Sequence, residues 1–227
     1  MKENSSQQLH MLRYTLTEQL IHGMEVSNLA YDLARELGYE KEICYELAKA
    51  GVLHDIGKIV LENYVEEQDT LVVEEMRFVR THSTLGYELL QGRGYSDFVL
   101  ESILYHHENA NGSGPFGKTW EEIPLFSRII HLSDLLDRAY GAKGFTEDIF
   151  NKACGYLHKN EGTVVDKECV DAFLQAFPLP HFLTLGEDSF EKNLWEKIPR
   201  IKQELSFAQI KELARFFAQI VDYKSPF

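Results

Sequence analysis

The chain of 227 residues has three cysteines, and Cys44, Cys154 and Cys169 lie far apart in the sequence. No two of them form a Cys-x-x-Cys pair, so the sequence indicates neither a disulfide framework nor a zinc ribbon. Such sparse and scattered cysteine usage is typical of proteins in a reducing compartment. We therefore expect a cytoplasmic protein.

Long hydrophobic runs are also missing. No apolar stretch reaches the roughly 18 residues that a membrane-spanning helix requires, and the polar residues 1–10 lack the apolar core of a secretion signal. Hydrophobic residues nevertheless make up 44% of the chain, which is enough to bury a core of ordinary size. We expect a folded protein without a membrane partner.

Positive charge is scarce, because 23 lysines and arginines stand against 36 aspartates and glutamates, a formal net charge of −13. Proteins that bind nucleic-acid polymers rely on lysine and arginine contacts to phosphates, so this balance argues against a DNA or RNA surface. A small nucleotide is not excluded. A bound divalent metal cluster supplies local positive charge whatever the net charge of the protein.

The alternating pattern typical of strands does not persist anywhere, and apolar residues instead recur at three- and four-residue steps. The helices predicted in this way cover residues 8–37, 40–53, 74–90, 96–107 and 124–140. An acidic loop is predicted at 62–73 and a glycine-rich loop at 109–118. Thr146, Asp166 and Ser206 are N-cap candidates for later helices. We expect an all-α fold.

The pattern divides the chain into three parts. Residues 1–145 hold the candidate chemistry, residues 146–205 form a helical extension, and residues 206–227 form a connecting helix with an apolar face. The chain ends on Phe227 without a polar tail, which indicates a cut inside a longer protein. The alternative is a C-terminal helix that packs on its own domain.

Nine histidines are more than a chain of this length usually has, and their positions indicate chemistry. His54 and Asp55 follow an apolar helix, where both side chains are costly to bury unless a partner such as a metal ion compensates them. Neighbouring helical residues point about 100° apart, so one can bind one metal ion while the other bridges to a second. Lys58 lies one turn after His54, within reach of a bound phosphate.

Other candidate ligands lie on separate predicted helices. They are Glu18, His22, His82, His106, His107 and Asp134. Mixed imidazole and carboxylate donors suit iron, manganese, cobalt, nickel or zinc better than calcium or magnesium. Each residue alone is more often a core or surface side chain, and the order of the set along the chain is what indicates a metal centre. His131, three residues before Asp134, is a candidate for supporting the centre from outside.

Four segments match motifs of a known family. They are His54-Asp55-Ile56-Gly57-Lys58 within residues 50–59, residues 81–86 around His82, Tyr105-His106-His107-Glu108 with the following loop, and residues 123–130 leading to Asp134. Together they resemble the HD superfamily of metal-dependent phosphohydrolases, and within it the HD-GYP branch, over roughly residues 15–140. The resemblance implies an HD-domain helical bundle with additional C-terminal helices.

The same resemblance implies a set of ligands and a substrate. The metal ligands would be His22, His54, Asp55, His82, His106, His107 and Asp134, holding two divalent ions that are often iron or manganese. Asp55 would be catalytic and bridge the ions, and Glu18 matches a glutamate of members that hold a third metal. Lys58 would be catalytic too, holding the scissile phosphate of a small nucleotide, which is cyclic di-GMP in this branch.

The loop after the paired histidines departs from the family pattern. The Gly-Tyr-Pro triplet that names the branch is absent, and Gly114 is followed here by Pro115 and Phe116. Two alternatives therefore stay open: hydrolysis of another nucleotide, and a catalytically weak module for ligand sensing or dimerisation. A helical bundle with incidental histidines is the third alternative, and the ordered ligand set argues against it.

The nucleotide-binding segment departs as well. Family members carry an Arg-Pro-Tyr-Arg-like segment after the last aspartate, whereas the segment after Asp134 is shorter here and offers Arg138 or Lys143 as substrate contacts. Glu25 stands where the family has an arginine. Residues 207–227 look like the helix that precedes another HD domain, which implies a second such domain in the full-length protein. A homodimer through the first or last helix is a further expectation.

Overall fold

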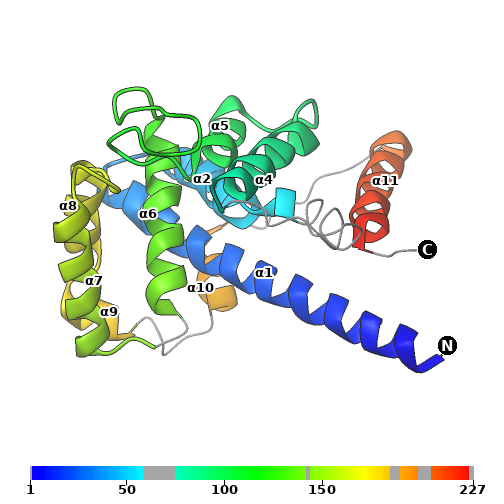
Figure 1. Cartoon of the computed structure of the whole chain (residues 1–227), viewed down its shortest axis with the longest axis horizontal. Coiled ribbons are helices and arrows are strands. Elements are labelled where there is room, and N and C mark those ends of the chain that lie inside the picture. Colours follow the sequence, from blue (N-terminus) through cyan, green and yellow to red (C-terminus); the bar gives the residue numbers. More distant parts are fainter. Residues whose placement is uncertain (1, 59–74, 142–143, 185–189, 199–205, 225–227) are drawn as a thin grey trace.

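The computed structural model describes residues 2–58, 75–141, 144–184, 190–198 and 206–224 (Figure 1). Within these residues the regular secondary structure is helical, and the β-pairing is confined to two isolated bridges, Asn111 with Thr119 and Glu161 with Val165. The predicted all-α fold is therefore confirmed. The predicted acidic loop at 62–73 lies outside the described residues.

Four of the five helices with predicted bounds begin and end within two residues of the prediction, and the first begins at Lys2, six residues before the predicted start. They are α1 Lys2–Glu36, α2 Lys41–Leu53, α4 Glu75–Leu90, α5 Asp97–Tyr105, α6 Leu125–Tyr140, α7 Glu147–Asn160, α8 Lys167–Ala176, α9 Leu179–Thr184, α10 Phe190–Lys197 and α11 Phe207–Lys224. The predicted caps Thr146, Asp166 and Ser206 each accept a backbone N–H from the first turn of the next helix. None of the helices within the described residues is long and apolar enough to cross a membrane.

Helix α1 crosses the molecule and packs against α2, α6, α8 and α10 (Figure 1). Its apolar residues at helical spacing, including Val26, Ala30 and Leu33, are completely buried. Helix α5 packs against α2, α4 and α6 on the other side. This arrangement brings α1, α2, α4, α5 and α6, which carry the candidate ligands, around one centre.

Gly57 and Gly86 allow the short segment after α2 to come unusually close to α4. A Cβ atom at Gly57 would collide with the carbonyl oxygen of His82 and would lie 2.6 Å from the backbone nitrogen of Gly86. Only glycine fits at this position, because the obstructing atoms are backbone and cannot turn away. The close approach leaves 3.3 Å between Nε2 of His82 and Oδ1 of Asp55. Gly57 thus helps to place a candidate ligand of α4 next to one from the end of α2.

Helices α7 to α9 bury Phe173, Phe177 and Phe182 in the same hydrophobic core as α1 and α2. Lys197 of α10 forms an ion pair with Asp32 of α1 at 2.7 Å. The later helices are therefore attached to the first helix at several points. The predicted boundary at residue 145 stays a prediction.

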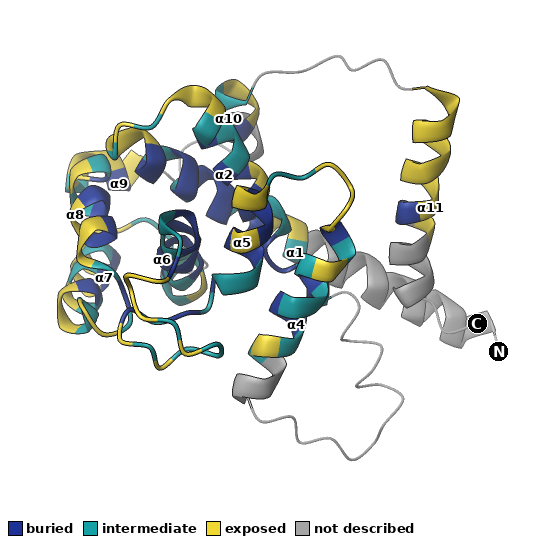
Figure 2. Cartoon of the chain, turned by 90° about the horizontal axis from the view of Figure 1, so that it is seen from above, coloured by how far each residue is buried: buried dark blue, intermediate teal, exposed yellow. Residues whose placement is uncertain are grey.

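Helix α11 contrasts with the other helices, since the part of it whose burial is described is mostly exposed (Figure 2). Phe207 is 82% exposed and Ile210 is 50% exposed, whereas Phe216 is buried beneath the guanidinium of Arg93, 4.7 Å from its ring centre. A helix lies where the connecting helix was predicted, and its role as a connection stays a prediction. The prediction that it leads into a second domain stays a prediction.

Candidate metal centre

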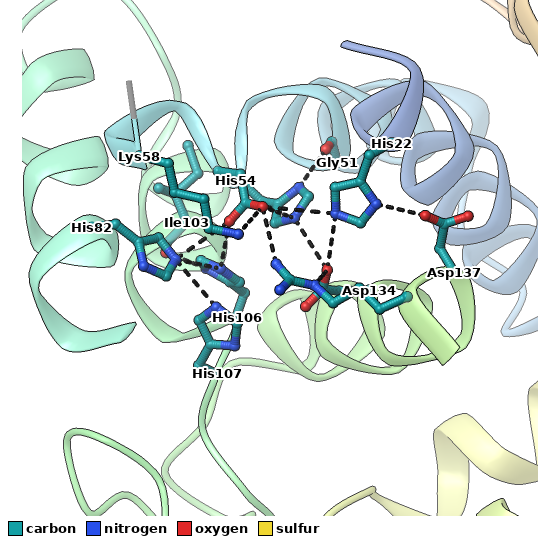
Figure 3. Close-up of polar contacts among 12 residues, drawn as sticks. His22, Gly51, His54, Lys58, His82, Ile103, His106, His107, Asp134 and Asp137 are labelled. Carbon is teal, nitrogen blue, oxygen red and sulfur yellow. Dashed lines mark hydrogen bonds and ion pairs between the residues drawn. The ribbon is translucent and has the colours of Figure 1, made fainter. Parts of the chain in front are cut away.

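Histidine and aspartate side chains from five helical segments converge on one place (Figure 3). The residues that meet there are His22 of α1, His54 and Asp55 after α2, His82 of α4, His106 and His107 after α5, and Asp134 of α6. These are the candidate ligands that the sequence placed on separate helices. Glu18 lies one turn before His22 on α1, and its side chain is outside the described part of the structure.

The donor atoms form two groups that share Asp55. One group is Asp55, His82, His106 and His107, the other is His22, His54, Asp55 and Asp134, and in each group the donor atoms lie within 4.8 Å of one another. Oδ1 of Asp55 is 3.3 Å from Nε2 of His82, whereas its Oδ2 is 3.4 Å from Nε2 of His54. One carboxylate therefore faces both groups with different oxygens, as a residue that bridges two metal ions must.

Backbone carbonyls orient two of the imidazoles. Nδ1 of His54 lies 2.7 Å from the carbonyl oxygen of Gly51, and Nδ1 of His106 lies 2.6 Å from that of Ile103 (Figure 3). A carbonyl oxygen can only accept, so Nδ1 carries the hydrogen and the lone pair of a neutral ring sits on Nε2, facing the centre. His131 donates its own Nδ1–H to the carbonyl of His106 at 2.8 Å. It supports the centre without facing it as a ligand.

The unsatisfied atoms of the centre fit a cation. Among the described residues, Nε2 of His22, Nε2 of His54 and Oδ1 of Asp55 are buried and form no hydrogen bond. Nε2 of His82 also lies 3.4 Å from that of His106 and 3.2 Å from that of His107. Buried polar atoms without a hydrogen-bond partner are costly, and a divalent metal ion would satisfy several at once. The donor set therefore fits metal ions.

The electrostatics of the centre also favour positive charge. Burial lowers the pKa of His54, but Asp55 and Asp134 outweigh burial and raise that pKa to about 10. Burial raises the pKa of Asp55 and of Asp134, but histidine partners, His54 foremost by charge, hold both values well below the usual range. Burial lowers the pKa of His106 to about 4. Asp55 and Asp134 thus stay ionised and the imidazole of His106 stays neutral, and these are the forms of the two side-chain types that bind metal.

Two basic side chains flank the shared carboxylate. Nζ of Lys58 forms an ion pair with Oδ2 of Asp55, and Nη2 of Arg138 lies 3.0 Å from the same oxygen. Nε of Arg138 lies 2.5 Å from Oδ1 of Asp134. Two of the three predicted substrate contacts are therefore at the centre. Lys143, the third, lies outside the described residues.

The sequence did not predict the pair of carboxyl groups, Asp137 and Glu25, that lies behind His22. Nδ1 of His22 lies 2.5 Å from Oδ2 of Asp137, so Asp137 orients this ligand as the carbonyls orient the others. Burial, followed by a hydrogen bond with Asp137, raises the pKa of Glu25 to about 8. Glu25 is then protonated at neutral pH and donates to Asp137. The available sequence signal was the position of Asp137, three residues after Asp134 on the same helix.

This pKa predicts a pH-dependent effect of Glu25→Gln. A carboxyl group whose folded-state pKa is raised contributes stability below its unfolded value near 4.5 and loses that contribution as the pH rises toward 8. Glutamine keeps the donor but cannot ionise. In chelator-treated protein we expect Glu25→Gln to raise Tm by roughly 2–4 °C at pH 8.5 and to leave it unchanged at pH 5.

Thermal unfolding at both pH values measures the effect. Glu88→Gln is the matched control, because Glu88 is an exposed glutamate on α4. It should shift Tm equally at both pH values. If Glu25→Gln also shifted Tm equally at both pH values, the result would contradict a proton shared between Glu25 and Asp137.

Glu108 has a structural role that its motif did not predict. It is 1% exposed, and its carboxylate accepts the backbone N–H of Phe116 at 2.7 Å and of Lys118 at 2.6 Å. The ring of Phe116 meets Tyr105 edge-on and lies under the guanidinium of Arg80, 5.1 Å from its ring centre. Glu108 thus fixes the rewritten glycine-rich loop beside His106 and His107.

Comparison with known proteins identifies relatives of the chain. The profile of the family described as HD domain matches residues 4–169. The cyclic di-GMP phosphodiesterase response regulator RpfG of Xanthomonas campestris pv. campestris is 34% identical over 155 residues, which cover 66% of this chain and 41% of that protein. The 3'3'-cGAMP-specific phosphodiesterase 3 of Vibrio cholerae is 29% identical over 150 residues, 65% of this chain and 33% of that protein.

The fold has a counterpart among solved structures. The crystal structure of V-cGAP3, a cyclic GMP-AMP-specific phosphodiesterase of V. cholerae, aligns with a TM-score of 0.71 at 20% sequence identity, over 90% of this chain and 56% of that one. At this identity the likeness shows the fold. The chain spans less than half the length of the two curated relatives named above.

Proposed function

Because the chain belongs to the HD domain family, we propose that it is a metal-dependent phosphodiesterase of cyclic dinucleotides, with cyclic di-GMP as the first candidate substrate. The observation that carries the proposal is Asp55, whose two oxygens face two groups of ligand-type side chains. Relatives named as cyclic di-GMP and 3'3'-cGAMP phosphodiesterases support the substrate class.

We assign one metal ion to Asp55, His82, His106 and His107 and a second to His22, His54, Asp55 and Asp134. Iron or manganese suits these nitrogen and oxygen donors. A third ion at Glu18 stays a prediction. When bound, the ions supply Lewis acidity at the phosphate and lower the pKa of water, so that a nucleophile is available near neutral pH.

The residues of the chain have separate tasks in this reaction. Hydrolysis joins a water oxygen to phosphorus and breaks the phosphorus–O3′ bond, which opens the ring to a linear dinucleotide. Lys58, held beside Asp55, binds a phosphate oxygen where negative charge builds up. The carbonyls of Gly51 and Ile103 keep His54 and His106 oriented throughout.

Lys58→Met tests the assigned phosphate contact. Methionine keeps the length of the side chain but removes the charge, so we expect kcat/KM for cyclic di-GMP to fall by about 10²–10³-fold. Lys58 supplies no ligand, so the metal content of metal-loaded protein should not fall. Lys49→Met is the matched control, because Lys49 lies on α2 and pairs with Glu46 instead. Unchanged turnover in Lys58→Met would contradict the assignment.

The second candidate substrate is 3'3'-cGAMP, which the names of Vibrio relatives favour. An assay of metal-loaded protein against cyclic di-GMP, 3'3'-cGAMP and linear dinucleotides separates the candidates. Turnover of either cyclic compound supports the proposal. Binding without turnover of any compound would favour the ligand-sensing alternative.

Three further expectations stay predictions. They are a homodimer, a second HD domain in the full-length protein, and a cytoplasmic location. The homodimer prediction rests on the exposed Phe207, Ile210 and Leu213 of α11. Sedimentation of the chain with and without Leu213→Glu tests the homodimer, which should dissociate in the variant.

A further inference from the structure

Arg138 is bound to the oxygens through which the second group would take up its metal ion. Its Nε lies 2.5 Å from Oδ1 of Asp134, and that same oxygen is 3.0 Å from Nε2 of His22 and 3.5 Å from Nε2 of His54. Its Nη2 lies 3.0 Å from Oδ2 of Asp55, the oxygen that faces the second group. One guanidinium therefore touches both carboxylates of this group.

These contacts follow from the helix and the side-chain type. Asp134 and Arg138 are spaced i, i+4 on α6, which puts them on one face of the helix. The guanidinium keeps its charge at any physiological pH and presents several donors in a planar fork, so it can contact two carboxylates at once. Lys58 contacts Asp55, but among the lysine and arginine side chains of the described residues Arg138 alone spans Asp55 and Asp134.

Burial makes the competition strong. The side chain of Asp134 is 2% exposed and that of Asp55 is 10% exposed, so neither carboxylate can rely on water for compensation. The side chain of Arg138 is itself 44% exposed, so it borders the solvent, unlike the two carboxylates. Arg138 can therefore leave the carboxylates when a stronger cation arrives, whereas the carboxylates cannot leave the centre.

We propose that Arg138 is a built-in counter-cation of the metal centre. It holds Asp134 and Asp55 in the metal-free protein, competes with the second metal ion for them, and is released toward the substrate phosphate when that ion binds. The release to substrate rests on the proposed function. The competition with metal does not, because it concerns the binding of metal ions alone.

Manganese titration of Arg138→Gln, by calorimetry on chelator-treated protein, tests the competition. We expect the variant to bind the second Mn²⁺ about tenfold more tightly than the wild type, since a charge-assisted contact no longer has to be broken. Its metal-free Tm should fall, because two buried carboxylates lose their partner. The rise in Tm on adding Mn²⁺ should therefore be larger than in the wild type, and Arg138→Lys should fall between the two.

Arg128→Gln is the matched control, because Arg128 lies on the same helix but pairs with Asp166 at 2.6 Å. It should lower Tm equally with and without Mn²⁺ and leave the affinity for Mn²⁺ unchanged. Equal or weaker Mn²⁺ binding in Arg138→Gln would overturn the proposal, since Arg138 would then position the ligands and not compete with the ion. Lack of cyclic dinucleotide turnover in the wild type would contradict the proposed function and leave the titration result standing.

Discussion

Asp55→Ala is expected to abolish binding of both metal ions and to lower cyclic dinucleotide turnover by about 10³-fold or more. The reason is its position, because Asp55 belongs to both groups of donor atoms and faces each with a different oxygen. The substitution also leaves the positive charge of His54 without Asp55, which is its main charged partner. The measurement is elemental analysis together with turnover of cyclic di-GMP on the same preparation.

Asp148→Ala is the matched control for this prediction. Asp148 is an aspartate of α7 whose side chain is 71% exposed and pairs with Lys152. It should keep the wild-type metal content and turnover. If Asp55→Ala retained two metal equivalents, Asp55 could not be the shared ligand, and the proposed mechanism would be wrong even if turnover were lost.

Gly57→Ala is expected to destabilise the protein by roughly 3 kcal/mol and to reduce metal binding as well. The added Cβ would collide with the carbonyl oxygen of His82 and lie 2.6 Å from the nitrogen of Gly86, and both are backbone atoms. The segment after α2 and helix α4 must therefore move apart, which takes His82 away from Asp55. Urea unfolding gives the change in free energy, and metal analysis reports the displacement of His82.

Gly155→Ala provides a matched control for the same chemical change. Gly155 lies on α7, and a Cβ there would meet no described atom within 4 Å. Alanine is the better helix former, so this variant should be unchanged or more stable by up to about 1 kcal/mol. A Gly57→Ala protein as stable as the wild type, with its full metal content, would mean that the segment around Gly57 and helix α4 lie further apart than the structure shows.

The sequence was sufficient to predict the parts of the structure that local rules govern. Apolar spacing predicted the helices, and the side chains of Thr146, Asp166 and Ser206 confirmed the predicted caps. The predicted family is also confirmed by the match of the HD domain profile to residues 4–169. The convergence of His22 and Asp134 could be expected only through the resemblance, because spacing within one helix says nothing about which helices meet.

Contacts between distant helices could not be predicted from the sequence. His22 and Asp137 are 115 positions apart, and their pairing depends on how α1 packs against α6. The contact between Arg138 and Asp55 likewise spans 83 positions. Arg138 was predicted as a substrate contact, but its hold on two ligand carboxylates appears only when the helices are assembled.

The steric and backbone requirements met by Gly57 and Glu108 could not be predicted from the sequence either. Gly57 was noticed as part of a motif, yet the physical reason for a glycine there is the backbone of α4, which no local pattern reveals. Glu108 was noticed as the residue after two histidines, and its role is to hold the backbone of a loop eight and ten positions later. Both residues act by positioning other parts of the chain. A search of the sequence for candidate metal ligands does not reveal such a role.

The most direct test of the central claim is elemental analysis of anaerobically purified wild type beside His22→Ala and His82→Ala. Each histidine belongs to only one of the two groups that share Asp55. Two centres that share one carboxylate predict about two metal equivalents in the wild type and about one in each variant. A wild-type protein without metal, or two equivalents retained in both variants, would contradict the metal centre described here.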